Sequence, residues 1–301
     1  MTRNELDPWI EGYLSYLADV RRMNGRTIID IRCTLKRVGT RMLAHRPQTP
    51  LWKLSLEDYL WWLARERDAG SARSVMAKQL SHVRGLLEYT WRSGRSDRNV
   101  LDGFALNDRV PKSKARALTL QEAQQLVDAC AGGSKPQRRA RMVILLLYGC
   151  GLRTSELRGL DVQDVDVERQ EIKVRHGKGG LQRTVPVPGA VWTELLAYLA
   201  ERQARRGPLL RTQEKGVRIS VKEAAAIVKG TAARAGIAGA VTPRTLRHTF
   251  GTHLTDRGVD IAVIGSLMGH RTPQESNAYL HGLPGRMEAA VESLTEEKEE
   301  A

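Results

Sequence analysis

Residues 165–186, VDVERQEIKVRHGKGGLQRTVP, interrupt a sequence that is otherwise patterned for helices. Apolar and polar residues alternate in three short runs, at 165–167, 172–174 and 184–185. Alternation with a period of two is typical of strands that are buried on one face. The glycines of the HGKGG segment (176–180) suit the tip of a hairpin. The stretch therefore predicts three short antiparallel strands, with Lys178 at the tip of the last hairpin.

On both sides of this stretch, apolar residues recur at the spacing of amphipathic helices. In the N-terminal third, Asp7-Pro8 is a helix-start signal and Ser55-x-x-Asp58 resembles a capping box. Thr119-x-x-Glu122 is a second capping box, after residue 118. Helices are expected at 27–44, 71–92, 142–148, 191–205, 221–235, 243–257, 261–268 and 273–280. The sequence therefore predicts a mostly α fold with one small sheet.

The chain is long enough, at 301 residues, for two hydrophobic cores. Residues 107–117, NDRVPKSKARA, are polar, basic and contain a proline, which is the composition of a linker. We therefore expect an N-terminal helical domain at 1–106 and a second domain at 118–285. The remaining residues, 286–301, form an acidic tail whose short apolar stripe is compatible with a helix.

The chain is strongly basic, with a formal net charge of +14 at pH 7. The tail holds six acidic and two basic side chains, so residues 1–285 carry +18. A charge of this sign and size favours a polyanionic partner, of which nucleic acid is the commonest. A basic protein without such a partner also fits. Charge therefore narrows the class of partner without naming a reaction.

Several other classes of protein find no support in the sequence. Cys33, Cys130 and Cys150 form no CxxC pair, and no Cys/His cluster has the spacing of a zinc site. We interpret the three cysteines as buried thiols in a reducing compartment. The N-terminus lacks the layout of a signal peptide, and the longest apolar run is too short to cross a membrane. We therefore expect a cytoplasmic protein with no zinc site and no membrane span.

The expected helix at 71–92 carries an apolar stripe on one side and basic side chains on the others. Arg73, Lys78 and Arg84 are candidates for contacts with DNA phosphates, because short hydroxyl side chains lie among them. A basic helix face is more often simply solvated. The phosphate interpretation gains weight only because the whole domain is basic and short hydroxyl side chains lie among the cations.

Two segments offer single cations to an anionic ligand. Arg153, in GLRTSEL (151–157), follows a glycine turn near the start of a helix, where backbone amides also attract anions. A structural ion pair with Glu156 is the alternative. Lys178 lies on a glycine-flanked hairpin, from which an ammonium can donate a proton to a leaving oxygen. Hairpin tips also carry lysines for solubility.

Two further segments lie near the C-terminus. Thr242-Pro243 is a helix start, and Arg244 and Arg247 then share one helical face, which suits a phosphate. Gly269 ends one helix and places His270 in a turn, and Tyr279 projects from the next expected helix. A surface cluster is the alternative for the two arginines, although adjacent cations repel and imply an anion that offsets them. Alone, His270 and Tyr279 are more often structural than catalytic.

Together these motifs resemble the tyrosine recombinase, or phage integrase, family. The resemblance rests on order and spacing across the chain: Arg153 in GLRTSEL, Lys178 in HGKGG, Arg247 in TLRHTFGTHL, and His270 with Tyr279 nine residues later. The family implies a SAM-like core-binding bundle and a catalytic domain of helices with a small sheet, which clamp duplex DNA from opposite sides. In size and layout the chain is similar to the Xer-type members, which resolve chromosome dimers. A small integrase of a mobile element or a transposon-borne resolvase also fits.

The resemblance also implies a mechanism. Tyr279 attacks a scissile phosphate, forms a 3′-phosphotyrosyl bond and releases a 5′-hydroxyl, and the reversal of this step needs no ATP. Arg153 and Arg247 hold the non-bridging oxygens, Lys178 protonates the leaving oxygen, and His270 donates a hydrogen bond to the phosphate. A homotetramer, or a tetramer with a paralogue, exchanges strands between two specific DNA sites through a Holliday junction. In such assemblies a segment like residues 286–301 docks on a neighbouring protomer. A frayed acidic tail is the alternative, and we prefer it for residues 296–301.

One position departs from the family pattern. Arg244 stands where members of the family have a histidine, three residues before the second arginine. Arginine is a very poor general base at neutral pH. We therefore expect Arg244 to act electrostatically, while water, His270 or the substrate phosphate takes the proton of Tyr279.

Two other classes of protein remain compatible with the sequence. One is a DNA-binding protein of the same fold with impaired catalysis, which the departure at Arg244 favours slightly. The other is a relaxing enzyme of the type IB topoisomerase kind, with the same chemistry but without pairing of two sites. A covalent protein–DNA adduct separates the first class, and recombination between two sites separates the second.

Overall fold

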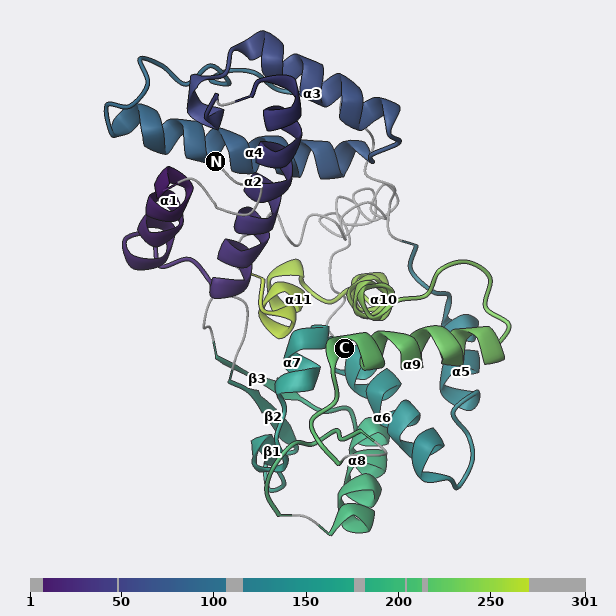
Figure 1. The fold of residues 1–301 in the computed structure, drawn as a ribbon. Coiled ribbons are helices and arrows are strands. Elements are labelled where there is room, and N and C mark those ends of the chain that lie inside the picture. Colours follow the sequence, from purple (N-terminus) through teal and green to yellow (C-terminus); the bar gives the residue numbers. More distant parts are fainter. Residues whose placement is uncertain are drawn as a thin grey trace, which may run out of the picture. The chain divides into compact units, whose positions relative to one another are not determined.

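The computed structural model describes residues 8–47, 49–106, 116–175, 182–203, 205–212 and 216–270. The chain divides into two compact units, residues 1–112 and 113–301 (Figure 1). Most of the expected linker, residues 107–115, lies outside the described residues, so its role stays a prediction. Within the described ranges, no helix combines the length and the apolar composition needed to span a membrane.

Unit 1 consists of helices and one 3-10 turn. Its elements are α1 (Pro8–Asp19), α2 (Gly25–His45), η1 (Leu51–Lys53), α3 (Leu56–Asp68) and α4 (Arg73–Arg92). The expected capping box at Ser55 is confirmed, because the Ser55 hydroxyl accepts a hydrogen bond from the Asp58 backbone while the Asp58 carboxylate accepts one from the Ser55 backbone. A proline at the first position of α1 agrees with the helix start expected at Asp7-Pro8.

The core of unit 1 is built from one apolar face of each helix. Tyr59 and Trp62 of α3 are fully buried, and the Tyr59 hydroxyl donates a hydrogen bond of 2.6 Å to the Leu51 carbonyl. One expectation is wrong here. Cys33 is exposed on α2, so only Cys130 and Cys150 are buried thiols.

Unit 2 is built around α6 (Lys135–Gly149), whose residues 142–147 are buried as the sequence predicts. Helices on several sides pack against it: α5 (Leu120–Asp128), α7 (Thr154–Gly159), α8 (Gly189–Arg202), α9 (Val221–Arg234) and α10 (Pro243–Asp256). The last described helix, α11 (Ile261–Met268), packs against α10 and spans the predicted residues. The capping boxes at Thr119 and Thr242 also form.

The three predicted strands are present as a small antiparallel sheet in the order β1-β2-β3. The strands are β1 (Val165–Asp166), β2 (Glu171–Val174) and β3 (Arg183–Pro186), and a short 3-10 turn, η2 (Val162–Asp164), precedes them. Ile172 pairs with Val165 on one side and Val185 on the other, so that apolar residues cover one face. A mostly α fold with one small antiparallel sheet is therefore confirmed. Lys178, at the expected hairpin tip, lies outside the described residues.

Candidate active site

The described part of the candidate site is organised around the carboxylate of Glu156 on α7. Its side chain has no exposed surface. Arg153, the N-cap residue of α7, donates its backbone N–H to Glu156 Oε2 at 2.8 Å and its Nη1 to Oε1 at 2.9 Å. The bond from the Arg153 backbone to Glu156 is one half of a capping box; the other half does not form, because a guanidinium cannot accept a hydrogen bond from the backbone. The ion pair that we weighed as an alternative role for Arg153 is therefore present.

Two more arginines, from distant parts of the chain, reach the same carboxylate. Arg183, the first residue of β3, donates from Nη1 and Nη2 to the two oxygens of Glu156, each at 2.8 Å. Arg247 of α10 places Nη1 3.9 Å from Glu156 Oε2. Burial raises the pKa of Glu156, but the hydrogen bonds from Arg183 and Arg153 lower it more, and the net pKa lies below its ordinary value. Glu156 is therefore a carboxylate at neutral pH and holds three guanidiniums together.

The same three arginines also bind the last turn of α11. Arg183 Nε donates to the Leu267 carbonyl at 2.9 Å, Arg247 Nη2 to Met268 at 2.5 Å, and Arg153 Nη2 to Gly269 at 2.7 Å. The final carbonyls of a helix have no partner within the helix, and cations are favoured at this negative end of the helix dipole. Consecutive carbonyls thus fix the orientation of each arginine. We call Arg153, Arg183, Arg247 and Glu156 the arginine cluster.

Two glycines allow the backbone to approach this closely. Gly269 caps α11 with a φ of +63°, and a Cβ there would lie 2.8 Å from Arg183 Nη1. Gly151 has a φ of +59°, and a Cβ there would lie 2.4 Å from a ring carbon of Phe250. The Gly151 carbonyl accepts a 2.6 Å hydrogen bond from Arg247 Nη1. Because other residues rarely adopt positive φ, both turns depend on glycine.

The structure brings some of the predicted site residues together. Arg153 and Arg247 meet in the arginine cluster, and His270 follows Gly269 directly, with its backbone N–H bonded to the Gly265 carbonyl at 2.9 Å. Lys178 and Tyr279 lie outside the described residues, so their positions stay predictions.

Arg244 and Arg247 differ more than the shared helix face suggested. The Arg247 side chain is 12% exposed and points into the arginine cluster, whereas Arg244 is exposed at the start of α10. Arg244 has no ion pair with any residue that the structure describes. Its charge therefore faces solvent near the helix N-terminus, where it is available to an anion.

Sequence reasoning missed Arg183. The residue lies 27 positions from Glu156, and no local motif links the two. The available signal was an arginine opening a strand of otherwise uncharged residues, directly after the segment that carries Lys178. That signal does not identify a partner.

The predicted DNA contacts of α4 also make contacts within unit 1. Lys78 Nζ lies 2.5 Å from Asp30 Oδ2 on α2, and both side chains are about half exposed. Arg84 donates from Nε to the Leu101 carbonyl at 3.1 Å and from Nη2 to Phe104. Arg84 therefore fastens the segment that follows α4. Contacts of Arg73, Lys78 and Arg84 with DNA stay predictions.

The fold and the arginine cluster define a helical domain suited to binding phosphate, because guanidiniums fixed in orientation match phosphate oxygens.

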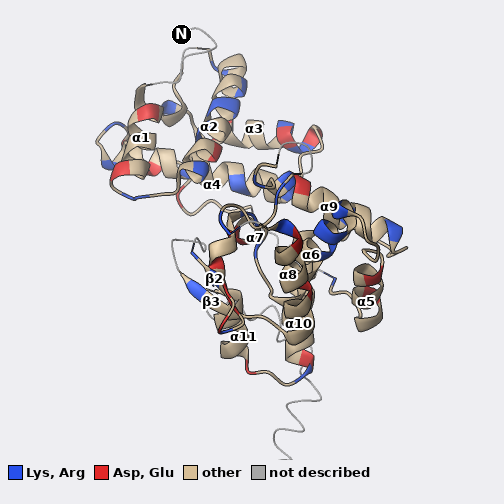
Figure 2. Ribbon diagram, turned by 90° about the horizontal axis from the view of Figure 1, so that it is seen from below, with Lys and Arg blue, Asp and Glu red and all other residues tan. Residues whose placement is uncertain are grey.

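Among the described residues no group of His, Cys, Asp and Glu side chains could hold a metal ion. Lys and Arg positions occur on helices of both units (Figure 2).

Comparison with known proteins identifies the class. Residues 116–286 match the Phage integrase family. The tyrosine recombinase XerD of Mycobacterium tuberculosis is 34% identical over 90% of this chain and 91% of that protein. The tyrosine recombinase XerA of Pyrococcus furiosus is 36% identical over 62% of this chain and 64% of that protein. The chain therefore belongs to the phage integrase family and is a tyrosine recombinase.

The fold agrees with a solved structure at lower identity. The integrase of the transposon Tn1549, solved in complex with transposon right end DNA, superposes with a TM-score of 0.73. The match covers 96% of this chain and 99% of that chain at 20% sequence identity. The fold is therefore shared along both units.

Proposed function

We propose that the protein cuts and rejoins DNA at specific sites, with Tyr279 as the nucleophile. Tyr279 attacks the scissile phosphate, the new bond is a 3′-phosphotyrosyl ester, and the 5′-oxygen leaves with a proton. Rejoining by a 5′-hydroxyl reverses the step and needs no cofactor. The observation that carries the proposal is the convergence of Arg153 and Arg247 on the end of α11, directly before His270.

The geometry supports a role for each described residue. Charge accumulates on the non-bridging oxygens of phosphate in the transition state, and donors that are already oriented stabilise it without reorganisation. Arg153 and Arg247 are such donors, because backbone carbonyls hold both. His270 would donate a hydrogen bond to the same phosphate. We assign Lys178 as the acid that protonates the leaving 5′-oxygen.

Arg244 adds positive charge without acting as a base. Its exposed place near the N-terminus of α10 suits electrostatic attraction of phosphate, and the proton of Tyr279 passes to water, His270 or the phosphate. Cleavage by Arg244→His compared with the wild type tests this role. An unchanged or lower rate agrees with it, and a large gain would show that a base is missing from the wild-type site.

We further propose that a homotetramer, alone or with a paralogue, acts on two duplex sites in the cytoplasm. Unit 1 would contribute Arg73, Lys78 and Arg84 to the DNA backbone. The Tn1549 integrase was solved on transposon DNA, which supports DNA as the partner. If Lys78 contacts a phosphate, Lys78→Gln lowers the salt dependence of DNA binding by about one unit of slope.

The decisive experiment traps the covalent intermediate. DNA that is covalently bound to the protein in cells is recovered and sequenced, and the site is rebuilt as a suicide substrate with a nick beside the scissile phosphate. The wild type is expected to form an adduct that survives denaturant, and Tyr279→Phe is expected to form none while binding DNA with the same affinity. Binding without an adduct in the wild type would refute the proposal and indicate a DNA-binding protein. Relaxation of supercoiled DNA without recombination of two sites would indicate a topoisomerase.

A further inference from the structure

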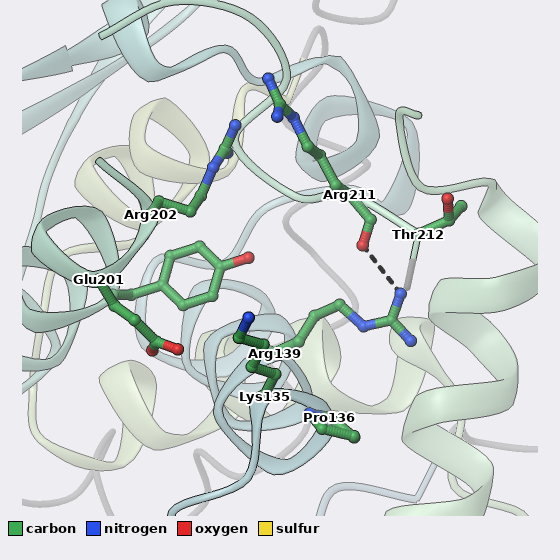
Figure 3. A pocket seen from close by; sticks show the side chains of 8 residues that line it. Lys135, Pro136, Arg139, Glu201, Arg202, Arg211 and Thr212 are labelled. Atoms are coloured by element: carbon green, nitrogen blue, oxygen red, sulfur yellow. Dashed lines mark hydrogen bonds between the residues drawn. The ribbon is translucent and has the colours of Figure 1, made fainter. Parts of the chain in front are cut away.

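Unit 2 contains a cavity of about 470 Å³. It is lined by the first residues of α6, the last turns of α8 and the segment at 211–212 (Figure 3). The lining residues are Lys135, Pro136, Arg139, Tyr198, Glu201, Arg202, Arg211 and Thr212. Its volume lies within the range of about 300–1,000 Å³ that is usual for small-molecule sites. Four cations and one carboxylate line it, so its charge favours an anion.

The carboxylates near the cavity have partners already. Glu201 pairs with Arg138, which does not line the cavity, at 2.5 Å. Glu223 pairs with Arg139 at 2.5 Å. Among the described residues, no carboxylate forms an ion pair with Arg202 or Arg211.

Several polar atoms of the lining are buried without a hydrogen-bond partner within the described chain. They are Arg139 Nε, Arg202 Nη2, Arg211 Nε and Thr212 Oγ1. A buried donor left unpaired costs about 1–3 kcal/mol, and such donors are rare in folded proteins. Because these four atoms have almost no accessible surface, a ligand in the cavity reaches them only when the lining side chains turn towards it, which the flexible stems of the arginines allow.

The guanidiniums also face one another. Figure 3 shows the ends of Arg202 and Arg211 close together at one side of the cavity. Burial, and then the nearby charge of Arg211, lower the pKa of Arg202. Burial raises the pKa of Tyr198, against the charges of Arg202 and Arg139. Arg202 Nη1 also donates to the Pro208 and Leu209 carbonyls, which offset part of the repulsion between the two guanidiniums. An anion between them would offset the rest.

We propose that this cavity binds a phosphorylated small molecule, with its phosphate between Arg202 and Arg211. Forked guanidinium donors match phosphate oxygens, and the N-terminus of α6 beside Lys135 adds a favourable dipole. The cavity has room for an organic group against Pro136 and Tyr198. Arg139 lies at the cavity, whereas α6 ends at Gly149, two residues before Gly151, whose carbonyl binds Arg247. Arg139 and Gly149 are ten residues, or about 15 Å, apart along α6, so the cavity is separate from the arginine cluster.

Titration calorimetry on the full-length protein without DNA tests the proposal. Pyrophosphate and Mg²⁺-free ATP are the probes, and sodium chloride at matched ionic strength is the blank. We expect saturable binding of one equivalent and a rise in Tm with probe concentration. Arg211→Gln and Lys135→Gln are each expected to weaken binding about tenfold. Arg206→Gln removes the same charge from an exposed position outside the lining and should leave the affinity unchanged.

Three outcomes would overturn the proposal: no saturable binding of either probe, equal weakening by Arg206→Gln and Arg211→Gln, or weakening of duplex DNA binding alone by Arg211→Gln. The last result would assign these arginines to a DNA phosphate instead. The test is independent of the proposed recombination. Tyr279→Phe should keep probe binding while losing the DNA adduct, and Arg211→Gln should keep the adduct.

Discussion

Replacing Glu156 with glutamine removes one negative charge from the centre of the arginine cluster and leaves the shape of the side chain almost unchanged. The carboxylate is fully buried and accepts hydrogen bonds from Arg153 and Arg183 at 2.8 to 2.9 Å. Removing one partner of a buried ion pair costs about 3–5 kcal/mol, because the other charges stay buried without compensation. We expect Glu156→Gln to destabilise unit 2 by this amount.

The loss is measured as the free energy of unfolding in urea. Amide hydrogen exchange of α6, followed by mass spectrometry, reports unit 2 separately from unit 1. For a unit of this size each kcal/mol corresponds to about 2–4 °C, so Tm should fall by roughly 6–20 °C. Glu194→Gln is the matched control. Glu194 pairs with Arg141 at 2.8 Å but is 38% exposed, and such pairs contribute about 0–1 kcal/mol.

The pH dependence has a definite sign. The pKa of Glu156 in the folded protein lies below its ordinary value, so the native state binds fewer protons than the unfolded state. The stabilisation is complete above the unfolded pKa, near 4.3, and is lost as the pH falls through the folded pKa. The wild type should therefore lose stability more steeply than Glu156→Gln below about pH 4.

A double-mutant cycle that combines Glu156→Gln with Arg183→Gln measures the interaction energy between these two residues. If Glu156 holds Arg183 as the distances indicate, the double variant is less destabilised than the sum of the single variants by about 1–3 kcal/mol. The reasoning is wrong if Glu156→Gln costs no more than Glu194→Gln. It is also wrong if the two single effects are additive.

Asp58→Asn should lower the free energy of unfolding of unit 1 by about 1–2 kcal/mol at pH 7, as measured in urea. The reason is that the carboxylate is stabilised in the folded state: burial raises the pKa of Asp58, but hydrogen bonds from Arg46 and the capping box lower it to about 2. The wild type should lose this contribution as the pH falls from 4 towards about 2, and the variant should not. Gly151→Ala should destabilise unit 2 by about 1–3 kcal/mol in the same assay, because φ at this position is positive and the new Cβ would clash with the Phe250 ring. Gly159→Ala is the control and should cost little, because a Cβ at Gly159 has no atom of another residue near it. Maleimide should label the folded protein once, at Cys33, as counted by mass spectrometry.

Local sequence was sufficient for much of the fold. The capping boxes at Ser55 and Thr119 begin helices because both partners lie within four residues. The three strands were predictable because alternation and a glycine-rich turn are also local. The ends of α8 were less well predicted: the helix spans Gly189–Arg202 instead of 191–205. No local stop signal was recognised there, and Gln203 ends the helix in a left-handed conformation.

The candidate site was predictable only in part, because tertiary contacts define it. Arg153 and Arg247 stand in recognisable motifs. Arg183 does not, and only the folded chain shows that it binds Glu156 and the end of α11. Helical periodicity placed Arg244 and Arg247 on one face, but it could not show that packing against the Gly151 turn draws only Arg247 into the cluster.

Arg183 connects the segment that carries Lys178 with the end of α11 before His270, and the proposed mechanism needs these two segments close together. It opens β3 soon after the segment that carries Lys178, and its Nε holds the Leu267 carbonyl three residues before His270. Its other two nitrogens bind Glu156, which also fixes Arg153. One guanidinium therefore sets the start of β3, the end of α11 and the N-terminus of α7 relative to one another. A lysine at this position keeps the charge but has a single donor group, so it could not hold all three.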